Sequence, residues 1–192
     1  MIFTVTGPSG SGKTSLVKAL VERYPNDFRE VVSTTTREAR PREIEGKDYY
    51  FISKEAFDKL VACDLLAEYV TFGGNSYGIA KREFQGALDG DQDAVVIVDC
   101  KGATKIKELY GDAVRNVYLE VDKGKAMKRL VRRDGWSKAK KRIAIDEQKG
   151  LFDTHGYDCI LNNDKAIKNL VENFCNYAIA MEYEQDMKGV CG

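Results

Sequence analysis

Apolar residues in this chain occur in short, nearly continuous runs rather than in strict alternation. Four such runs are Ile2–Val5, Ala94–Val98, Val114–Val121 and Cys159–Leu161. Runs of this length and continuity are typical of strands buried on both faces, as in a parallel sheet with helical connections. The pattern therefore predicts an α/β chain with a parallel sheet flanked by helices. A further short strand is predicted at Val31–Val32.

Helical spacing of apolar residues follows in most of the remaining segments. The predicted helices are Thr14–Arg23, Ala103–Tyr110, Lys123–Arg133, Lys138–Lys149 and Lys165–Tyr183. In the last of them the apolar positions fall on one face, which indicates core packing and needs no functional interpretation.

The segment from about Thr34 to Gly90 has a different character. Tyr49–Ile52 and Glu68–Phe72 alternate as strands do, and a short helical stripe lies between them. We therefore predict a small mixed α+β insert that interrupts the parallel core.

A glycine-rich run directly follows the first predicted strand. Gly7–Thr14 fits G-x-x-x-x-G-K-[ST] at every fixed position, and a helical pattern begins at once behind it. Glycines let such a loop curl so that its N–H groups point inward, and the helix N-terminus adds positive potential. Lys13 can then reach the outer phosphates of a nucleotide, and the Thr14 hydroxyl can bind Mg²⁺. A glycine-rich turn that fits by chance is the alternative, which the flanking strand and helix disfavour.

Composition narrows the class of partner and the compartment. The 192 residues include 30 basic and 30 acidic side chains, which argues against general nucleic-acid or membrane-surface binding. No apolar run approaches the roughly 20 residues that span a bilayer, and we expect no signal peptide. The five cysteines form no C-x-x-C pair and are expected to be reduced, structural thiols. A cytoplasmic protein is predicted.

A second candidate phosphate site lies at the start of the insert. Arg37 and Arg40 are three residues apart and follow several hydroxyl side chains, so they could hold a phosphate through charge-assisted hydrogen bonds. Tyr49 and Tyr77 stand beside turn residues and could donate to phosphate oxygens. A solvated charged loop is an equally simple interpretation of the arginines alone.

Taken together, these motifs resemble those of guanylate kinases in order and spacing. The matching segments are Gly7–Thr14, Ser33–Pro41, Gly46–Phe51, Glu68, Gly74–Gly78, Asp99-x-x-Gly102 and Tyr157–Asp164. The resemblance implies a P-loop kinase that transfers the γ-phosphoryl group of ATP to GMP or dGMP with Mg²⁺. It also implies a core of residues 1–33, 91–122 and 156–192, an acceptor-binding insert of residues 34–90 and a helical lid of about residues 123–155.

The same resemblance assigns roles by position. ATP binding falls to Ser9, Gly10, Ser11, Gly12, Lys13, Thr14, Ser15, Arg129 and Asn163, with Asp164 in the same loop as Asn163. GMP binding falls to Ser33, Arg37, Arg40, Tyr49, Glu68, Tyr77, Gly78 and Asp99. The implied catalytic residues are Lys13, Arg37, Arg40, Arg133 and Arg142, and the implied metal ligands are Thr14 and Asp99.

Basic residues are dense between Lys123 and Arg142. A solvated helical face and a local nucleic-acid patch are two interpretations of this charge. The resemblance favours a third, in which the segment is a lid that brings arginines to the transferring phosphoryl group, where they would neutralise developing charge. Which arginine has which role stays open, because the segment between Arg133 and Arg142 is slightly shorter than usual.

Several positions depart from the guanylate kinase pattern. Ile79 replaces a usual Ser or Thr hydroxyl that contacts guanine, Ile97 replaces a frequent acidic residue, and Ala39 and Arg42 replace Pro and Gly. We therefore hypothesise altered base recognition with phosphoryl transfer retained. A kinase for another mononucleotide and a non-catalytic binding module are the alternatives. Expected partners are ATP and GMP or dGMP, without nucleic acid or membrane, for a monomer or homodimer.

Overall fold

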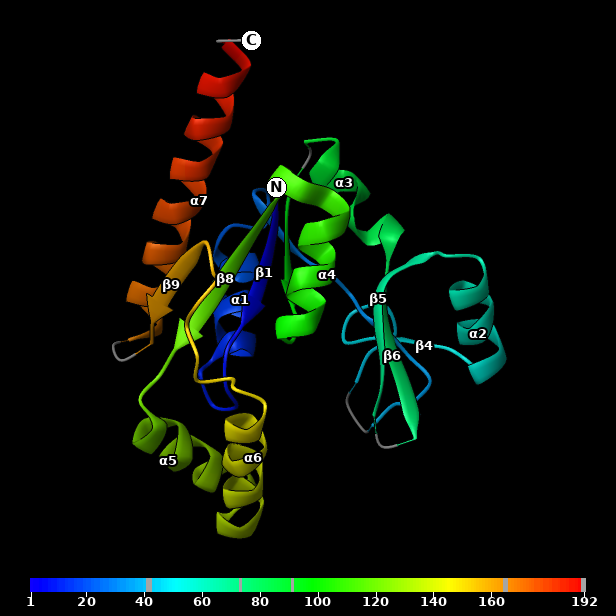
Figure 1. Cartoon of the computed structure of the whole chain (residues 1–192), viewed down its shortest axis with the longest axis vertical. Coiled ribbons are helices and arrows are strands. Elements are labelled where there is room, and N and C mark those ends of the chain that lie inside the picture. The colour runs from blue at the N-terminus through cyan, green and yellow to red at the C-terminus, as the bar shows by residue number, and fades with distance from the viewer. Residues whose placement is uncertain (41–42, 73, 91, 164–165, 191–192) are drawn as a thin grey trace.

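A five-stranded parallel sheet forms the centre of the molecule in the computed structural model, which describes residues 1–40, 43–72, 74–90, 92–163 and 166–190. Its order is β2-β7-β1-β8-β9. The strands are β2 (Phe28–Glu30), β7 (Asp93–Ile97), β1 (Ile2–Thr6), β8 (Val114–Glu120) and β9 (Cys159–Asn162). Ile2 of β1 is in register with Ala94 on one side and Val114 on the other. The predicted parallel sheet is confirmed, and its strands all end at the same edge (Figure 1).

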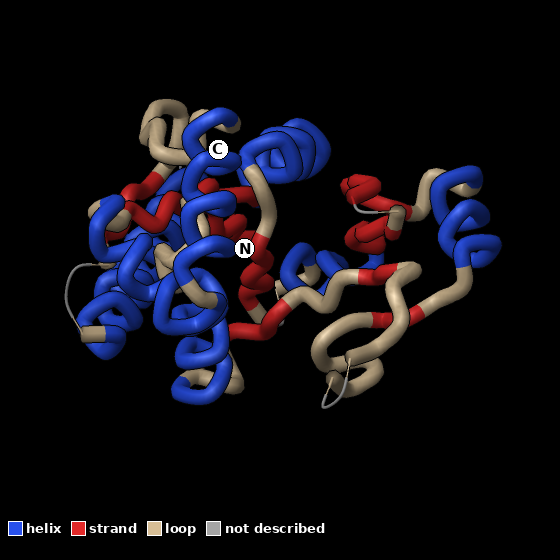
Figure 2. The backbone as a smooth tube through the Cα atoms, turned by 90° about the horizontal axis from the view of Figure 1, so that it is seen from below, coloured by secondary structure: helices blue, strands red, loops and turns tan. Residues whose placement is uncertain are grey.

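Helices cover both faces of this sheet, as Figure 2 shows. The helices α1 (Lys13–Arg23) and α7 (Ile167–Val190) pack together over one face, and α4 (Cys100–Tyr110) covers the other. Successive residues of β1 point to opposite sides, as a strand requires. Phe3 therefore joins the core under α1 and α7, where its ring meets Phe174 edge-on at 5.2 Å, while Ile2 joins the core under α4.

A second, smaller sheet lies to one side of the central one and has the order β4-β3-β6-β5. Its strands are β4 (Tyr50–Phe51), β3 (Thr34–Thr35), β6 (Asn75–Ala80) and β5 (Leu66–Phe72), with both parallel and antiparallel pairs. The helix α2 (Lys54–Ala62) seals its outer face through Phe57, and Ser53 caps that helix by accepting from the Ala56 N–H at 3.1 Å. Ile79 of β6 instead joins the core beneath α4.

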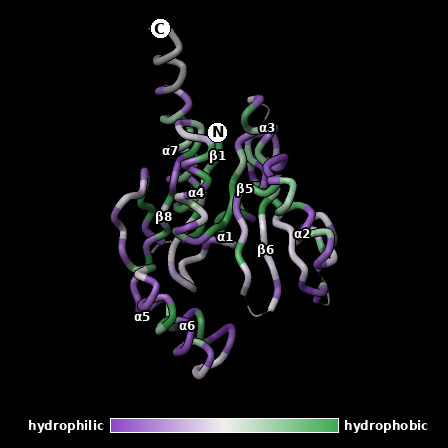
Figure 3. Tube along the Cα trace, turned by 45° about the vertical axis from the view of Figure 1, so that its right-hand side comes forward, coloured by the Kyte–Doolittle hydropathy of each residue, from purple (hydrophilic) through white to green (hydrophobic). Residues whose placement is uncertain are grey.

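A helical hairpin extends from the sheet edge where the central strands end (Figure 1). It consists of α5 (Lys123–Asp134) and α6 (Trp136–Gln148), joined at Gly135, whose φ of 83° suits glycine. Leu130 and Ile143 belong to a small apolar cluster of its own. Most of its other residues are hydrophilic (Figure 3).

Several element boundaries differ from the sequence predictions. The edge strand is Phe28–Glu30 rather than Val31–Val32, although Val31 is also buried and its N–H donates to the Val95 carbonyl oxygen at 3.0 Å. The short helix α3 (Gln85–Leu88) and the 3₁₀ turns at Lys81–Phe84 and Gly111–Ala113 were not predicted. Helix α7 continues to Val190, and Lys165, where it was predicted to begin, lies outside the described residues.

The predictions about the cysteines and about membrane-spanning segments can also be compared with the structure. Cys63, Cys100, Cys159 and Cys175 are free thiols, and Cys191 lies outside the described residues. Within the described part of the chain, no helix combines the length and apolar character needed to cross a membrane.

Candidate functional site

The loop between β1 and α1 takes a shape that only glycine allows at three positions. Gly7, Gly10 and Gly12 have φ values of 137°, 82° and 98°, which side chains rarely adopt. A Cβ on Gly7 would lie 2.5 Å from the Leu119 carbonyl oxygen, so β8 also lies too close to the loop for a side chain at this position. The loop is thus closely packed against the sheet, and its curl follows from the glycine pattern seen in the sequence.

Lys13, the first residue of α1, folds back over this loop. Its Nζ donates to the carbonyl oxygens of Gly7 at 2.7 Å and Pro8 at 3.0 Å. Burial lowers the pKa of Lys13 to about 8, an effect that Asp146 opposes and Arg133 reinforces. The ammonium group is therefore held at the loop, where it would meet the phosphates of a bound nucleotide.

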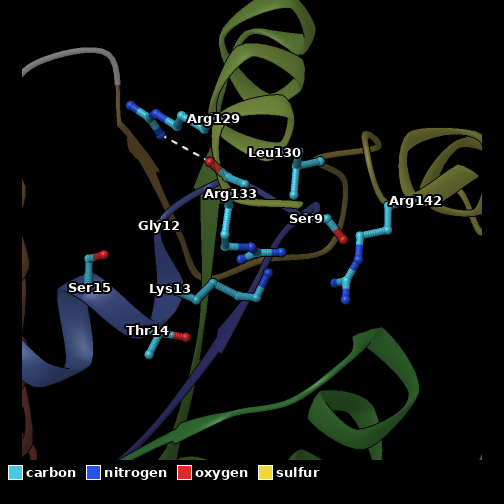
Figure 4. A pocket seen from close by; sticks show the side chains of 10 residues that line it. Ser9, Gly12, Lys13, Thr14, Ser15, Arg129, Leu130, Arg133 and Arg142 are labelled. Carbon is cyan, nitrogen blue, oxygen red and sulfur yellow. Dashed lines mark hydrogen bonds between the residues drawn. The ribbon is translucent and has the colours of Figure 1, made fainter. Parts of the chain in front are cut away.

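A cavity of about 380 Å³ opens over the loop, and Figure 4 shows its lining. Most of the residues predicted to bind ATP or to supply lid arginines line it. They are Ser9, Gly10, Gly12, Lys13, Thr14, Ser15, Arg129, Arg133 and Arg142, together with Leu130. The sequence prediction thus named nine of ten lining residues, although these belong to the loop and to three separate helices.

Three further hydrogen bonds join the loop to Arg129 and Asn163 and these two residues to each other. Arg129 of α5 donates to the carbonyl oxygens of Gly10 at 3.1 Å and Asn163 at 2.9 Å. The side-chain amide of Asn163 donates in turn to the Ser11 carbonyl. Ser11 and Asn163 are predicted to bind ATP, but both are buried and neither lines the cavity. Asn163 instead contacts the loop through Ser11. Asp164, predicted beside them, lies outside the described residues.

Arg133 and Arg142 approach the cavity from different helices of the hairpin. Both guanidinium groups lie near the carboxylate of Asp134, with Arg133 Nη2 at 2.8 Å and Arg142 Nε at 3.6 Å from its Oδ2. Figure 4 shows the two arginines pointing into the cavity on either side of Ser9. The Asp134 carboxylate thus lies close to both guanidinium groups at the opening of the cavity.

A second cavity, of about 340 Å³, adjoins the first. Ser9 and Lys13 line both, so the two spaces meet at the loop. Six of the predicted GMP-binding residues line the second cavity, namely Ser33, Tyr49, Glu68, Tyr77, Gly78 and Asp99. Val70, Ile79, Ile97 and Val98 supply apolar walls, and Asp146 and Leu151 face it from the side of the helical hairpin.

Two carboxylates within this cavity interact with each other. Burial raises the pKa of Glu68, the charge of Asp99 raises it further, and Lys105 partly opposes both. Asp99 follows β7 and caps α4, because its Oδ1 accepts from the Gly102 N–H at 3.0 Å. A Cβ on Gly102 would lie 3.3 Å from the Glu68 carboxyl carbon, so glycine leaves room for that carboxylate.

The two predicted phosphate-binding arginines lie outside this cavity. Arg37 Nη2 donates to both carboxylate oxygens of Glu43, at 2.8 and 3.0 Å, and its guanidinium stands 5.5 Å from the Tyr49 ring centre. The Arg40 side chain is exposed, while its N–H donates to the same Glu43 at 2.7 Å. Arg37 is thus adjacent to the cavity through Tyr49, whereas Arg40 is not. Arg42 lies outside the described residues.

Thr14 and Asp99 are compatible with a magnesium ion. Both supply oxygen, which Mg²⁺ prefers, and this ion typically takes one or two protein ligands together with phosphates and water. They line adjoining cavities that meet at Lys13. No group of three acidic, His or Cys side chains that could cage a metal occurs in the described ranges. The residues present therefore suit a metal that arrives with a nucleotide.

Asp146 and Glu43 are the contacts that sequence reasoning missed. Asp146 lies within a predicted helix and no motif distinguishes it, whereas Glu43 ends the arginine-containing stretch that resembles guanylate kinases but was given no role. Their partners, Ser9 and Arg37, are fixed only by the folded chain.

Comparisons with known proteins agree with this geometry. The sequence model of the guanylate kinase family matches residues 2–176. A guanylate kinase of Lactiplantibacillus plantarum is 32% identical over 96% of this chain and 94% of its own length. One of Francisella tularensis is 32% identical over 92% and 94%. The crystal structure of guanylate kinase from Anaplasma phagocytophilum superposes with a TM-score of 0.66 at 26% identity, covering 94% of this chain and 85% of that one. This chain belongs to the guanylate kinase family.

Proposed function

We propose that this chain transfers the γ-phosphoryl group of ATP to GMP or dGMP, giving ADP and GDP or dGDP. The observation that carries the proposal is the junction of two cavities at Ser9 and Lys13. One cavity is lined by the glycine-rich loop and arginines, and the other by Glu68 and hydroxyl side chains. Two substrates bound there would have their phosphates facing each other across Lys13.

The loop cavity suits the phosphates of ATP. Loop N–H groups at a helix N-terminus bind anions, and Lys13 adds a positive charge beside them. Arg133 and Arg142, held by Asp134, add two more charges at the open side. This concentration of positive charge favours a triphosphate over an uncharged ligand.

The second cavity suits a guanine nucleotide. A buried carboxylate accepts hydrogen bonds from adjacent N–H donors, and guanine has such a pair on one edge whereas adenine does not. Glu68 would therefore favour guanine, since an adenine would leave the carboxylate unpaired. Tyr49 and Tyr77 would bind the acceptor phosphate, with Arg37 beside Tyr49 as the charged partner.

In the reaction, an oxygen of the GMP phosphate attacks the γ-phosphorus while the bond to the ADP oxygen breaks. The nucleophile is already anionic, so no general base is required. Lys13 and the hairpin arginines would neutralise charge on the transferring group, which is the main protein contribution in this chemistry. Mg²⁺, bound through Thr14 and Asp99, would supply further neutralisation of the phosphates.

Closure of the two flanking segments is part of the proposal. The insert, residues 34–90, would approach the loop and bring Arg37 and Arg40 to the acceptor phosphate. The lid, about residues 123–155, would close over ATP and exclude water. The core of residues 1–33, 91–122 and 156–192 would stay in place. The cytoplasmic location and the choice between monomer and homodimer stay predictions.

The decisive experiment is a coupled ADP-release assay with Mg·ATP and a panel of ribo- and deoxyribonucleoside monophosphates. We expect selective turnover of GMP and dGMP. Lys13→Ala should abolish it, and Arg23→Ala, which removes a positive charge from an exposed position on the same helix, is the matched control. Turnover of another base would replace the substrate, and retained ATP binding without turnover would favour a binding module.

A second comparison tests the arginines. Arg37→Ala should raise the KM for GMP at least tenfold, because charge-assisted phosphate contacts are worth about 1.5–3 kcal/mol each. Arg40→Ala should do the same only if closure brings this exposed side chain inward. An unchanged KM in Arg40→Ala would remove it from the acceptor site while leaving the reaction itself in place.

A further inference from the structure

The helical hairpin places a carboxylate in the phosphate-binding loop. Asp146 of α6 accepts from the Ser9 backbone N–H, at 2.6 Å from its Oδ2, and only 6% of the residue is exposed. A buried carboxylate must be balanced by donors and positive charge. Here the donor is a loop N–H, and the nearby positive charge is Lys13, whose pKa Asp146 raises against the larger effect of burial.

Asp146 contacts the residues that the two cavities share. Ser9 and Lys13 line both cavities, so under the proposed function the transferred group would move close to both residues. Asp146 bonds to the first and interacts with the second, and its residue lines the acceptor cavity. The carboxylate therefore lies at the junction rather than at the rim.

A carboxylate and a phosphate group compete for the same hydrogen-bond donors and positive charges. Both are anionic acceptors, both are favoured by loop N–H groups and by Lys13, and like charges at short distance repel each other. We propose that Asp146 is an internal substitute for the terminal phosphate of ATP. It occupies the Ser9 N–H in the nucleotide-free chain, leaves when a third phosphate arrives, and so sets the affinity for triphosphate relative to diphosphate. This inference rests on the proposed ATP site.

The same helix carries the group that would replace it. Arg142 lies one turn before Asp146 on α6, so the two side chains share a face of that helix. Without nucleotide, Asp146 docks this face onto the loop. With ATP bound, the terminal phosphate repels Asp146 and attracts Arg142, which already lines the loop cavity. A shift of α6 by one helical turn, about 6 Å along its axis, would exchange one for the other.

Isothermal titration calorimetry of ATP and ADP, each with excess Mg²⁺, tests this directly. Asp146→Asn should tighten ATP binding at least about fivefold relative to ADP, since two unit charges about 4 Å apart repel by about 1 kcal/mol even in water and by more at a buried site. The titrations are run at pH 7, where Lys13, with its pKa of about 8, is still mostly protonated. Glu147→Gln removes one carboxylate from an exposed position of the same helix and should leave the ATP-to-ADP affinity ratio unchanged.

Three results would overturn the proposal. One is an unchanged affinity ratio in Asp146→Asn, and another is the same change in Glu147→Gln. The third is weaker ATP binding with Mg²⁺ but not with EDTA, which would make Asp146 a metal ligand. Thermal melting identifies a variant that fails to fold, and Asp146→Ser, which keeps a short acceptor without charge, then carries the same expectation. Wild-type protein that binds no ATP would contradict the proposed function instead.

Discussion

Glu68 on β5 and Ile79 on β6 are cross-strand partners, and both line the acceptor cavity. Side chains directly opposite each other in an antiparallel pair lie on the same face of the sheet. A carboxylate and a branched hydrocarbon are thus set side by side where a base would bind. Ile79 is also buried in the core beneath α4, with 1% of its surface exposed. Its side chain therefore supplies no hydrogen-bond donor or acceptor to this cavity.

This pair predicts the effect of a hydroxyl at position 79. Guanine carries a carbonyl oxygen where adenine carries an amino group, so a donor in the pocket can favour guanine. In Ile79→Ser we expect kcat/KM for GMP relative to AMP to rise about fivefold, as one hydrogen bond of about 1 kcal/mol would give. Ile79→Val removes volume without adding a donor and should cost only about 0.5–1.5 kcal/mol of stability. An identical GMP-to-AMP ratio in all three enzymes would exclude a role for this position in base choice.

Glu68 itself is predicted to determine acceptor affinity. Glu68→Gln keeps the size of the side chain but replaces one acceptor by a donor, which opposes the N–H groups of guanine. We expect kcat/KM for GMP to fall about 10- to 100-fold, since hydrogen bonds to charged groups are worth about 1.5–3 kcal/mol. The Kd for ATP, measured by calorimetry, should not change, because Glu68 does not line the loop cavity. Weaker ATP binding would mean that the substitution disturbs the fold.

The raised pKa of Glu68 predicts that kcat/KM for GMP falls at acidic pH. Burial and Asp99 raise the pKa of Glu68 above its usual 4.5. Below that raised pKa the carboxyl is protonated and loses acceptor capacity, so kcat/KM for GMP should fall as the pH drops through it. A pH profile measured for wild type and Glu68→Gln checks this, because the variant should lack that limb.

Local sequence was sufficient to predict the centre of the fold. The strand β1 is apolar on both faces, and Ile2 and Phe3 enter two different cores. The loop behind it needs glycine at positions fixed by its own curl, so its pattern is readable without knowledge of the rest of the chain. The loop residues that line the cavity could therefore be predicted from the motif alone, whereas Arg129, Arg133 and Arg142 were assigned through the resemblance to guanylate kinases.

Other parts of the site depend on contacts that no local pattern contains. Asp146 reaches Ser9 across 137 positions of sequence. Glu43 competes for Arg37, so an arginine predicted to face a phosphate is held by a carboxylate instead. The edge strand includes Phe28, whose ring packs against Phe174, a residue far along the chain. Each of these depends on tertiary packing.

The lack of a side chain at Gly102 is predicted to keep space for the Glu68 carboxylate. A Cβ there would lie 3.1 Å from Val98 Cβ and 3.3 Å from the Glu68 carboxyl carbon, and Val98 is held in the core. In Gly102→Ala the carboxylate must give way, and we expect the KM for GMP to rise about tenfold, since small displacements of positioning groups are costly. Helix propensity favours alanine by about 1 kcal/mol, so stability should not fall.

A glycine in another helix provides the control for this substitution. At Gly86 a Cβ would meet Arg29 Nε at 3.5 Å, an ordinary contact distance. Gly86→Ala should therefore leave the KM for GMP unchanged. A raised KM in both variants, or a lowered melting temperature in Gly102→Ala, would show that the effect is not specific to the Glu68 carboxylate.

Lys13 is predicted to take up a proton when nucleotide binds. In the free chain burial lowers its pKa to about 8, so above that pH the side chain is mostly neutral. Phosphate beside it favours the charged form and raises the pKa. Binding of ADP or ATP at pH 8 should therefore be accompanied by uptake of about half a proton. The affinity should fall as the pH rises above 8. Calorimetry in buffers of different ionisation enthalpy measures this uptake, and Lys13→Arg should abolish it, because arginine stays charged throughout. Equal uptake in both proteins would mean that another group supplies the titration.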